Sequence, residues 1–400
     1  MASFPTAGRC VLAKQAKSLH HSFHPWIFSG SIAHEPANHS PGTPLAVTDG
    51  QGSFVGWAQY NPGSKIRLRI LSWREDRYPD RNFYADQLSQ ALCRRQPLQD
   101  EYTTAVRLIF SEADGLPGLI VDRLANTLVV QFLTFGMDAI KSLITELLID
   151  LAPQLLPSPF ELRAIVERSD GDGRQLEGLP PVQAILYGVA EPISIVEAGV
   201  PFLVNSAGQK TGFYTDQRAN RARVASYARG ARMLDVCAYT GGFSVHAQRA
   251  GAASCTLIDS SAQALNEAQV NLSGNARLVE ADAFQELRRL YQDSQRYDLI
   301  VLDPPKLAPT RASLPKALAA YKDLNLQALK LLEPGGVLAS FSCSGLVKAD
   351  DLRLWIAYAA KDAGKRVQIL EQLHQAPCHP ILLSFPESEY LKGFILRVVE

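Results

Sequence analysis

A run of apolar residues, a pair of glycines and a helical pattern follow one another between Arg232 and Ser244. Residues 233–236, bounded by turn-forming residues, predict a buried parallel strand. A strand that enters a helix through a glycine turn is typical of nucleotide-binding α/β units, although a plain turn is the alternative. Because glycine lets a ligand approach the backbone, we expect a cofactor here. The turn residues expected to contact it are Tyr239, Thr240, Gly241, Gly242 and Phe243.

Three acids near predicted strand ends indicate which cofactor this is. Asp259 ends the second strand, about 20 residues after the glycine turn, where a carboxylate binds a ribose. Asp235 can accept from an ammonium group, and Asp282, after the third strand, can receive an adenine amino group. The turn lacks the G-x-G-x-x-G spacing that binds a pyrophosphate. This combination favours S-adenosylmethionine (SAM) over NAD.

The stretch from Asp303 through two prolines to Lys306 follows an apolar strand predicted for residues 299–302. The prolines have fixed φ angles and no N–H groups, so the tip is rigid. Such tips occur in enzymes that methylate nucleobases, where the carboxylate binds or protonates the edge of an unstacked base. We expect Asp303 to meet both base and cofactor and Lys306 to take part in catalysis; a structural strand cap is the alternative.

Cys343 lies in a Ser-Cys-Ser-Gly turn after another predicted strand. Carbon 5 of a pyrimidine becomes a nucleophile only when a thiolate adds to carbon 6, and it can then attack the methyl group of SAM. A free thiol has a pKa of about 8.5, so hydroxyl and N–H donors of the turn would help to form the thiolate. We expect Cys343 to be catalytic. The alternative, a buried structural thiol, is our interpretation of Cys237.

The composition excludes several classes of protein. The 40 Lys and Arg balance 40 Asp and Glu, so a nucleic-acid-binding surface has to be local. A hydrophobic content of 46% without a membrane-length run or a signal peptide predicts a soluble protein. The six cysteines form no C-x-x-C pair, which argues against a disulfide framework or a zinc site. We expect a cytoplasmic protein with free thiols, no metal and no membrane partner.

The chain is too long for one ordinary core, and its patterns divide it into three parts. Residues 1–75 contain short strand patterns and predict a small β domain. Within it, Lys65, Arg67 and Arg69 alternate with apolar residues, so the three cations share one face of a strand. This face would contact RNA phosphates, or else form the solvated outer face of a small barrel.

Residues 76–190 predict a small α+β domain. The patterns indicate a helix over residues 82–95, a hairpin around residues 125–126 and a helix over residues 139–151 that Pro153 stops. The acids of this region show no spacing typical of a metal site, so we interpret them as turn and surface residues. They are Glu112, Asp114 and Asp122.

Residues 191–400 predict the α/β domain that carries the chemistry. Five strand–helix steps and a final antiparallel pair, residues 381–385 and 391–399, indicate the Rossmann-like sheet of SAM-dependent methyltransferases. The candidate residues follow its strands and should gather at one edge. A polar loop at residues 205–218 precedes the first parallel strand and is expected to face the ligand, with Gln217 and Arg218 as cofactor contacts.

Seven segments resemble the RlmI family of bacterial 23S ribosomal RNA 5-methylcytosine methyltransferases. They are HPWIFSG at 24–30, EADGLPG at 112–118, KTGFYTDQR at 210–218, YTGGF at 239–243, DPPK at 303–306, YKD at 321–323 and FSCSG at 341–345. The resemblance implies an N-terminal PUA domain for RNA, a central α+β domain and a C-terminal methyltransferase domain. It implies Cys343 as the nucleophile, Asp303 as the base-binding acid, cytosine 1962 of 23S rRNA as the target, and a homodimer.

One position departs from many other RNA cytosine-5 methyltransferases, which carry a second cysteine after the proline of the Asp-Pro motif. This chain has Pro305 there, so product release has to proceed without that thiol. The acceptor of the carbon-5 proton stays open between Lys306 and a water held by Asp303. Two other functions stay open: methylation of a guanine or adenine nitrogen, which needs no thiol at Cys343, and a non-catalytic role in RNA binding or ribosome assembly.

Overall fold

The computed structural model describes residues 8–13, 22–36, 39, 42–204 and 212–399 of the 400-residue chain. The chain divides into two compact units. One consists of Met1–Ile195, Ser206–Phe213 and Cys378–Ser388, and the other of Val196–Asn205, Tyr214–Pro377 and Glu389–Glu400. The predicted division into residues 1–75, 76–190 and 191–400 stays a proposal, since the first unit contains two separate sheets.

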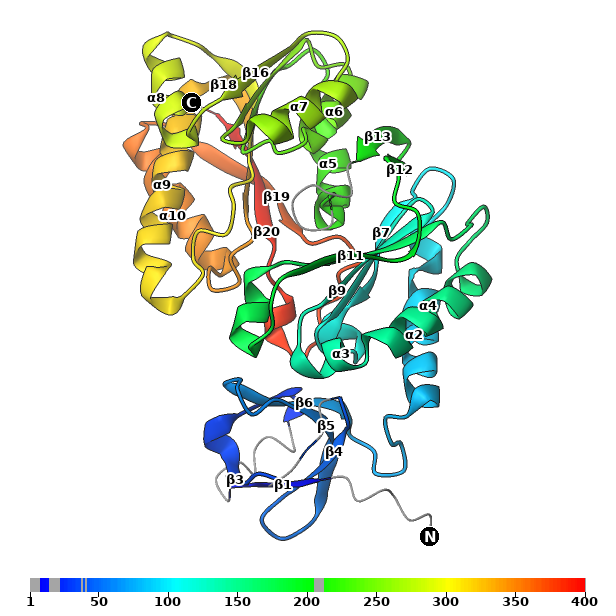
Figure 1. Ribbon diagram of the computed structural model, residues 1–400. Coiled ribbons are helices and arrows are strands. Elements are labelled where there is room, and N and C mark those ends of the chain that lie inside the picture. The colour runs from blue at the N-terminus through cyan, green and yellow to red at the C-terminus, as the bar shows by residue number, and fades with distance from the viewer. Residues whose placement is uncertain (1–7, 14–21, 37–38, 40–41, 205–211, 400) are drawn as a thin grey trace. The chain divides into compact units, whose positions relative to one another are not determined.

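Six strands of the first unit form a sheet in the order β2-β6-β5-β4-β1-β3, drawn in blue in Figure 1. The alternating pattern of β6 buries Leu68 and Ile70 in one cluster with Leu45 and Ile27. This confirms the β-rich start of the chain. The strands are β1 (Arg9–Leu12), β2 (Trp26–Phe28), β3 (Ile32–His34), β4 (Leu45–Thr48), β5 (Phe54–Tyr60) and β6 (Ile66–Ser72), with the 3-10 turn η2 (Ser29–Ser31).

The second sheet of this unit has the order β11-β10-β9-β8-β7 and packs against helices α2 and α4. Helix α2 is the helix predicted over residues 82–95, and it begins where the Asp80 carboxylate accepts from the N–H of Phe83 at 2.9 Å. The elements are α2 (Arg81–Arg95), η3 (Gln96–Leu98), β7 (Ala105–Phe110), η4 (Ser111–Asp114), β8 (Leu119–Leu124), β9 (Thr127–Phe132), α3 (Phe135–Ala139), α4 (Lys141–Leu155), β10 (Ala164–Ser169), η5 (Asp172–Glu177) and β11 (Val182–Gly188).

Two predictions for this region are wrong. Helix α4 continues past Pro153 to Leu155, because a proline in the last turn removes only one hydrogen bond near the helix end. The three acids interpreted as surface residues are buried, because each has an arginine partner from another part of the unit that compensates its charge. The shortest ion-pair distances lie between 2.6 and 2.9 Å, for Glu112 with Arg69, Asp114 with Arg95 and Asp122 with Arg107.

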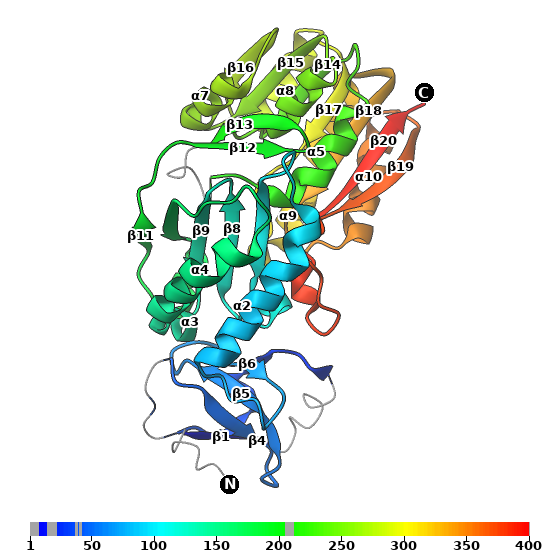
Figure 2. The same cartoon turned by 90° about the vertical axis from the view of Figure 1, so that its right-hand side faces the viewer.

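The second unit is built on a seven-stranded sheet in the order β16-β15-β14-β17-β18-β20-β19. Neighbouring strands from β16 to β18 are parallel, and β20 is antiparallel to β18 and β19. Helices α5, α6 and α7 cover one face, and α8, α9 and α10 cover the other (Figure 1 and Figure 2). This confirms the predicted Rossmann-like fold.

The elements from residue 193 onward have the following bounds, including the two-stranded hairpin of β12 and β13 that precedes the sheet and the 3-10 turn η8, which belongs to the first unit. They are β12 (Ile193–Glu197), β13 (Val200–Val204), η6 (Thr215–Gln217), α5 (Arg218–Ala225), β14 (Arg232–Val236), α6 (Gly242–Arg249), β15 (Ser254–Asp259), α7 (Ala262–Asn271), β16 (Ala276–Glu280), α8 (Ala283–Gln292), β17 (Tyr297–Leu302), η7 (Arg311–Ser313), α9 (Leu314–Leu331), β18 (Leu332–Ser342), α10 (Ala349–Asp362), β19 (Val367–His374), η8 (Pro386–Ser388) and β20 (Lys392–Val398).

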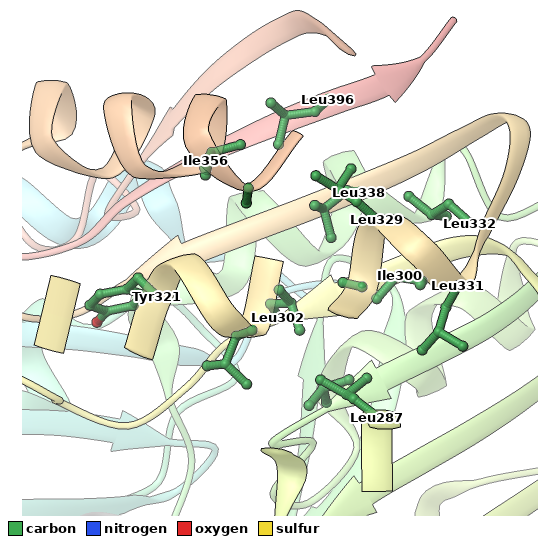
Figure 3. Close-up of a cluster of buried hydrophobic side chains, with 14 of the residues drawn as sticks. Leu287, Ile300, Leu302, Tyr321, Leu329, Leu331, Leu332, Leu338, Ile356 and Leu396 are labelled. Atoms are coloured by element: carbon green, nitrogen blue, oxygen red, sulfur yellow. The ribbon is translucent and has the colours of Figure 1, made fainter. Parts of the chain in front are cut away.

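A core of branched aliphatic side chains joins the sheet to α8, α9 and α10 (Figure 3). Ile300 and Leu302 of β17 and Leu338 of β18 are buried in it, together with Leu329 of α9. Tyr321 of α9 lies in the same core, about halfway along the helix. Each fully buried side chain of this kind contributes about 1.5–3 kcal/mol, so the strand ends rest on a well-packed base.

The predicted pairing of residues 381–385 with residues 391–399 is wrong. β20 pairs instead with β19, and residues 381–385 contain only an isolated bridge between Leu382 and Phe385. β19 was not predicted because it is an edge strand in which only Leu373 is buried, so the apolar pattern of a central strand is missing.

Within the described ranges, no helix has the length and apolar character that crossing a membrane requires. The same residues contain no group of three or more His, Cys, Asp or Glu side chains arranged to hold a metal ion. All six cysteines are free thiols.

Candidate active site

The ends of four parallel strands meet at one edge of the seven-stranded sheet. Val236 of β14 lies in register with Ile258 of β15 and Leu302 of β17, and Leu302 pairs in turn with Ser340 of β18. Residues that follow these positions therefore gather at the same edge. They are the turn at 237–242, Asp259, Asp303 and Cys343.

The turn after β14 has a strained backbone that a neighbouring acid stabilises. Cys237 and Tyr239 have positive φ angles of 61° and 50°, a region that non-glycine residues rarely adopt. The N–H of Tyr239 donates to Oδ2 of Asp259 at 2.8 Å. The acid predicted to bind the ribose thus also fixes the turn predicted to bind the cofactor.

The packing of the protein itself restricts both glycines of the turn, in addition to the predicted approach of a ligand. A Cβ on Gly242 would lie 2.5 Å from Nε of Arg221, and one on Gly241 would lie 3.1 Å from Cδ2 of Leu257. Gly241 also has a φ of 75°. Arg221 is held there by Glu197, whose carboxylate lies 2.9 Å from Nη1. Cofactor contacts of the turn remain predictions.

Asp235 is fully buried in β14, and only one of its carboxylate oxygens is satisfied. Oδ2 accepts from the N–H of Ser244 at 3.1 Å and from its hydroxyl at 2.7 Å. Oδ1 is buried and has no hydrogen-bond partner in the described part of the chain. Burial raises the pKa of Asp235 to about 6, although both hydrogen bonds from Ser244 lower it. A buried oxygen without a partner beside the turn fits the ammonium acceptor that the sequence predicts.

Asp259 and Asp282 follow the next two strands. Besides Tyr239, Asp259 binds the N–H of Ser261, which donates to Oδ1 at 2.9 Å, and its side chain stays partly exposed. Because each carboxylate oxygen has two lone pairs, Asp259 can still accept from a ribose hydroxyl. Asp282 is exposed and caps α8 by accepting from the N–H of Gln285 at 3.0 Å. Its contact with adenine stays a prediction.

Cys343 and the tip that begins with Asp303 lie together. Sγ of Cys343 is 3.8 Å from the carbonyl oxygen of Pro304, and its side chain is half-buried. The N–H of Asp303 donates to the carbonyl of Val236 at 3.3 Å, which attaches the tip to the end of β14. The structure therefore brings together Cys343 and Pro304, which lie 39 positions apart in the sequence.

Asp303 has a strongly raised pKa. Burial first and the negative charge of Asp216 second raise the pKa of Asp303 to about 7, so a large fraction of the carboxyl groups is protonated near neutral pH. Asp216 was not singled out in the sequence: its Oδ2 accepts from the hydroxyl of Tyr390 at 2.5 Å, and its Oδ1 is buried without a partner among the described residues. A protonated carboxyl donates a hydrogen bond, so Asp303 can bind an acceptor on the edge of a base.

An aromatic residue, Tyr214, adjoins this group. Burial raises its pKa, with further contributions from Tyr239, Asp216, Asp303 and Cys343. The ring of Tyr214 meets the ring of Tyr239 edge to face, with 5.2 Å between the centroids. Tyrosine rings stack with nucleobases, so the group combines a stacking surface with a carboxyl and a thiol.

Buried hydroxyl groups hold the turn that contains Cys343. The hydroxyl of Ser342 donates to Oη of Tyr321 at 2.8 Å, and Oγ of Ser344 accepts from the N–H of Ala308 at 3.2 Å. These serines were predicted to help form the thiolate, and the structure shows that their hydroxyls fix the turn. A buried lysine, Lys392, also binds this turn and was missed, because only the register of β20 brings it there.

The remaining predicted residues of the second unit have varied surroundings. Gln217 is buried, and its side chain lowers the pKa of Asp303, as does the charge of Arg221. Arg218 begins α5 and is half-buried, and Lys306 is exposed. The first half of the predicted ligand-facing loop, residues 205–211, lies outside the described residues.

The three cations predicted to bind RNA belong to the first unit and differ from one another. Lys65 is exposed, whereas Nε of Arg67 lies 2.8 Å from Oε1 of Glu35. Arg69 is only 9% exposed and forms ion pairs of 2.9 Å with Glu112 and Glu177. Both interpretations of this face are therefore wrong for Arg69, whose partners come from distant parts of the sequence. Contacts of Lys65 and Arg67 with RNA remain predictions.

The polar groups of the second unit fit SAM. The buried, unsatisfied Oδ1 of Asp235 suits an ammonium group, and Asp259 supplies a carboxylate at the end of the second strand. Tyr239 is attached to Asp259, so the turn and the ribose acceptor form one rigid piece. These residues are the ones that would hold the cofactor.

Family models match two parts of the chain. A model of a PUA-like domain matches residues 11–73, and a model of an S-adenosylmethionine-dependent methyltransferase matches residues 181–385. The second match contains β14 to β19 of the seven-stranded sheet and ends before β20. The comparison therefore agrees with the cofactor that the strand-end acids indicate.

Relatives of similar length are proteins named ribosomal RNA large subunit methyltransferase I. One from Shewanella frigidimarina is 41% identical over 387 residues, which cover 94% of this chain and 95% of its own. One from Erwinia tasmaniensis is 38% identical over 405 residues, covering 98% and 99%. A Streptococcus mutans structure described as a SAM-dependent methyltransferase is 19% identical, with a TM-score of 0.81 and coverage of 98% and 100%. The structure of SMU.776, complexed with SAH, has a TM-score of 0.82 at 19% identity. These structural likenesses show the fold.

Proposed function

The chain belongs to the family of ribosomal RNA large subunit methyltransferase I proteins, and we propose that it methylates carbon 5 of a cytosine through a bond to Cys343. Methylation of ribosomal RNA with SAM as the methyl donor is what the relatives and the family model support. Cytosine 1962 of 23S rRNA, the target that the resemblance implies, is part of the same proposal. The observation that carries the carbon-5 chemistry is the position of Cys343 Sγ, 3.8 Å from the Pro304 carbonyl on the Asp303 tip.

The residues of this site have separate roles in the proposed reaction. The Cys343 thiolate adds to carbon 6 and forms an S–C bond, which places an electron pair on carbon 5. Bound SAM supplies the methyl group that this electron pair attacks. Because the pKa of Asp303 is raised to about 7, its protonated form is available near neutral pH, and this form donates a hydrogen bond to N3 and stabilises the charge that develops in the ring. Loss of the carbon-5 proton and cleavage of the S–C bond then restore the double bond and the thiolate.

The carbon-5 proton needs an acceptor at this edge of the sheet. Lys306 is exposed directly after the tip, and a water held by the ionised form of Asp303 is the other candidate. Pro305 occupies the place where many related enzymes have a second thiol. In this proposal the S–C bond breaks by elimination once the proton has left, so a second thiol is not required.

The test uses 23S rRNA from a strain that lacks the gene, the purified protein and SAM with a labelled methyl group. After digestion of the RNA to nucleosides, we expect the label in 5-methylcytidine. Cys343→Ala should produce no labelled 5-methylcytidine, whereas Cys93→Ala, at an exposed thiol of α2, should behave as the wild type.

The other outcomes distinguish the alternatives. Label in a methylated guanine or adenine would be consistent with a SAM-dependent methyltransferase but would show that the thiol mechanism is wrong. Exocyclic and ring nitrogens have their own lone pairs and need no thiolate. No label in RNA from any fraction would favour a non-catalytic RNA-binding or ribosome-assembly factor. Repeating the assay with assembled subunits separates a wrong function from a wrong form of the substrate.

Three broader parts of the proposal rest on the family resemblance. We infer that the PUA-like domain binds RNA, that the protein works in the cytoplasm and that it forms a homodimer. Gel-shift titration of residues 11–73 is not a suitable test, because the domain shares the buried ion pairs of Arg69 with the rest of its unit. RNA binding should be measured on the full chain with Lys65→Ala, and the dimer by light scattering.

A further inference from the structure

Lys392 is a buried cation at the start of β20. Its side chain is 3% exposed, and its backbone is in register with Ser342, the residue before Cys343. Lysine is almost never fully buried unless a partner compensates its charge, because the desolvation of an ammonium group is costly. The surroundings of Lys392 should therefore contain the reason for its burial.

Two backbone carbonyls bind the ammonium group. Nζ of Lys392 donates to the carbonyl oxygen of Ser344 at 2.9 Å and to that of Val347 at 2.6 Å. The N–H of Val347 also donates to the Ser344 carbonyl at 3.0 Å. One side chain from β20 thus closes the segment that directly follows Cys343.

No carboxylate forms an ion pair with Lys392 in the described part of the chain, where the ion pairs involve other cations. Two carbonyl dipoles compensate only part of the cost of burying a full charge. Burial lowers the pKa of Lys392 to about 8, and the charges of Glu389, Cys343 and Asp351 act in the opposite direction. Of these three groups, Cys343 directly precedes the segment that Lys392 binds.

The interaction of two charges is mutual. If the Cys343 thiolate stabilises the ammonium form of Lys392, the ammonium stabilises the thiolate by the same free energy. Among the described residues, Tyr214 and Tyr321 also interact electrostatically with Cys343, and each favours the neutral thiol when it is ionised. Asp303, which precedes the Pro304 carbonyl that Sγ contacts, acts in the same direction when it is ionised. Lys392 is a cation that opposes them from the adjacent strand.

We propose that Lys392 is a positioning residue that fixes the Cys343 turn and stabilises the Cys343 thiolate with its charge. The proposal deepens the proposed function, because it explains how the nucleophile forms without the serine hydroxyls, which are directed to other partners. Its charge coupling, however, does not require RNA or SAM and can be measured without either.

The experiment is the pH dependence of Cys343 alkylation by iodoacetamide, followed by mass spectrometry of the peptide that contains Cys343. Thiolate, and not thiol, reacts, so the midpoint of the rate profile reports thiolate formation. Three variants are compared with the wild type. Lys392→Met removes charge and hydrogen bonds, Lys392→Gln keeps N–H donors but removes the charge, and Lys365→Met is the matched control.

Lys365 is a suitable control because it binds a carbonyl at the opposite end of β18. Its Nζ donates to the carbonyl of Leu332 at 2.5 Å, and burial lowers its pKa too. We expect both Lys392 variants to shift the alkylation midpoint upward by about one pH unit, which is about a tenfold slower reaction at pH 7. Lys365→Met should leave the midpoint unchanged.

An unchanged midpoint in folded Lys392→Gln would overturn the charge coupling, since a structural role alone would not move a pH profile selectively. If neither variant of Lys392 folds, Cys343→Ala provides the reciprocal measurement. Without the thiolate, the Lys392 ammonium should titrate at a lower pH in an NMR titration of lysine side chains, and an unshifted titration would contradict the proposal. If the Lys392 variants shift the pH profile of alkylation but the wild type forms no 5-methylcytidine, the charge coupling of Lys392 to Cys343 would stand and the proposed function would be wrong.

Discussion

The buried charged groups of the first unit and those at the strand ends of the second unit differ in how neighbouring groups compensate their charge. In the first unit, Arg95 holds both oxygens of Asp114 at 2.7 and 2.6 Å, and Arg69 bridges Glu112 and Glu177 at 2.9 Å. At the strand ends, Asp303 has a raised pKa, and within the part of the chain that the structure describes Asp235 has an unsatisfied oxygen and Lys392 binds carbonyl groups only.

This difference separates buried charges that stabilise the fold from buried charges that are suited to catalysis or binding. A buried ion pair compensates its own desolvation and stays ionised, so it holds the structure in one arrangement. A buried charge without a partner has a shifted pKa and can bind or exchange a proton, which is typical of active sites. Glu197 forms ion pairs with Arg221 and His246 beside the turn after β14. The second unit therefore also contains buried charges that are compensated by ion pairs.

Removing the nucleophile should give the largest effect on function and almost none on the fold. For Cys343→Ala we expect turnover to fall by at least about a thousandfold, because no other group forms the bond to carbon 6. SAM affinity, measured by calorimetry, should stay near that of the wild type, since the thiol meets the base. Full methylation of RNA by this variant would show that the covalent mechanism is wrong.

Breaking a buried pair of the first unit should instead reduce stability. Arg95→Met leaves the Asp114 carboxylate buried without its main partner, and we expect a loss of about 3–5 kcal/mol in the free energy of unfolding. Urea denaturation followed by fluorescence checks this value. Arg74→Met, which breaks the exposed pair with Asp76, is the control and should change stability little. If the two substitutions changed the free energy of unfolding equally, the buried ion pairs of the first unit would have no special role in its stability.

Asp259 tests the cofactor side of the strand ends. Asp259→Ala removes a charge-assisted acceptor and should weaken SAM binding by about 1.5–3 kcal/mol in calorimetry. The loss of its bond to the Tyr239 N–H would also relax the turn. Alkylation of Cys343 should proceed as in the wild type. Unchanged SAM affinity would mean that Asp259 only supports the backbone.

The raised pKa of Asp303 predicts a specific pH dependence of stability. Its pKa rises from 3.8 to about 7 in the folded state, so between these values the folded protein binds more protons than the unfolded chain. This group therefore makes the wild type less stable as pH rises from about 4 to 7, with no further change above that window. Asp303→Asn should gain stability relative to the wild type across the same window.

The relative gain should be about 2 kcal/mol, since solvent screening reduces the ideal 1.36 kcal/mol per pH unit. Thermal unfolding at pH 4.5 and pH 8 measures it. A difference between variant and wild type that does not change with pH would show that Asp303 is ionised in the folded protein. It would then belong with the fully charged acids of the first unit.

Local patterns were sufficient to predict the strand-end residues. A buried strand, a turn and a helix are encoded within about 15 consecutive residues, so the turn after β14 and the tip at Asp303 could be placed correctly. Parallel strands also place their ends at one edge without knowledge of side-chain contacts. Cys343 and Asp303 could therefore be brought together from the sequence.

Features that depend on distant partners could not be predicted. Glu112 and Arg69 lie 43 residues apart, and no local spacing shows that each compensates the other. Lys392 reaches the Cys343 turn only through the antiparallel register of β20, and the requirement for Gly242 comes from Arg221. Edge strand β19 has too few buried residues to show a strand pattern.

The most direct measurement of the central claim is to trap the bond between Cys343 and the base. A 23S rRNA fragment in which 5-fluorocytidine replaces cytidine cannot lose a proton from carbon 5, so the adduct formed with SAM should persist. Peptide mass spectrometry should then find the nucleotide on Cys343, with no adduct in Cys343→Ala. Formation of 5-methylcytidine in normal RNA without any adduct at Cys343 in the fluorinated RNA would contradict the account.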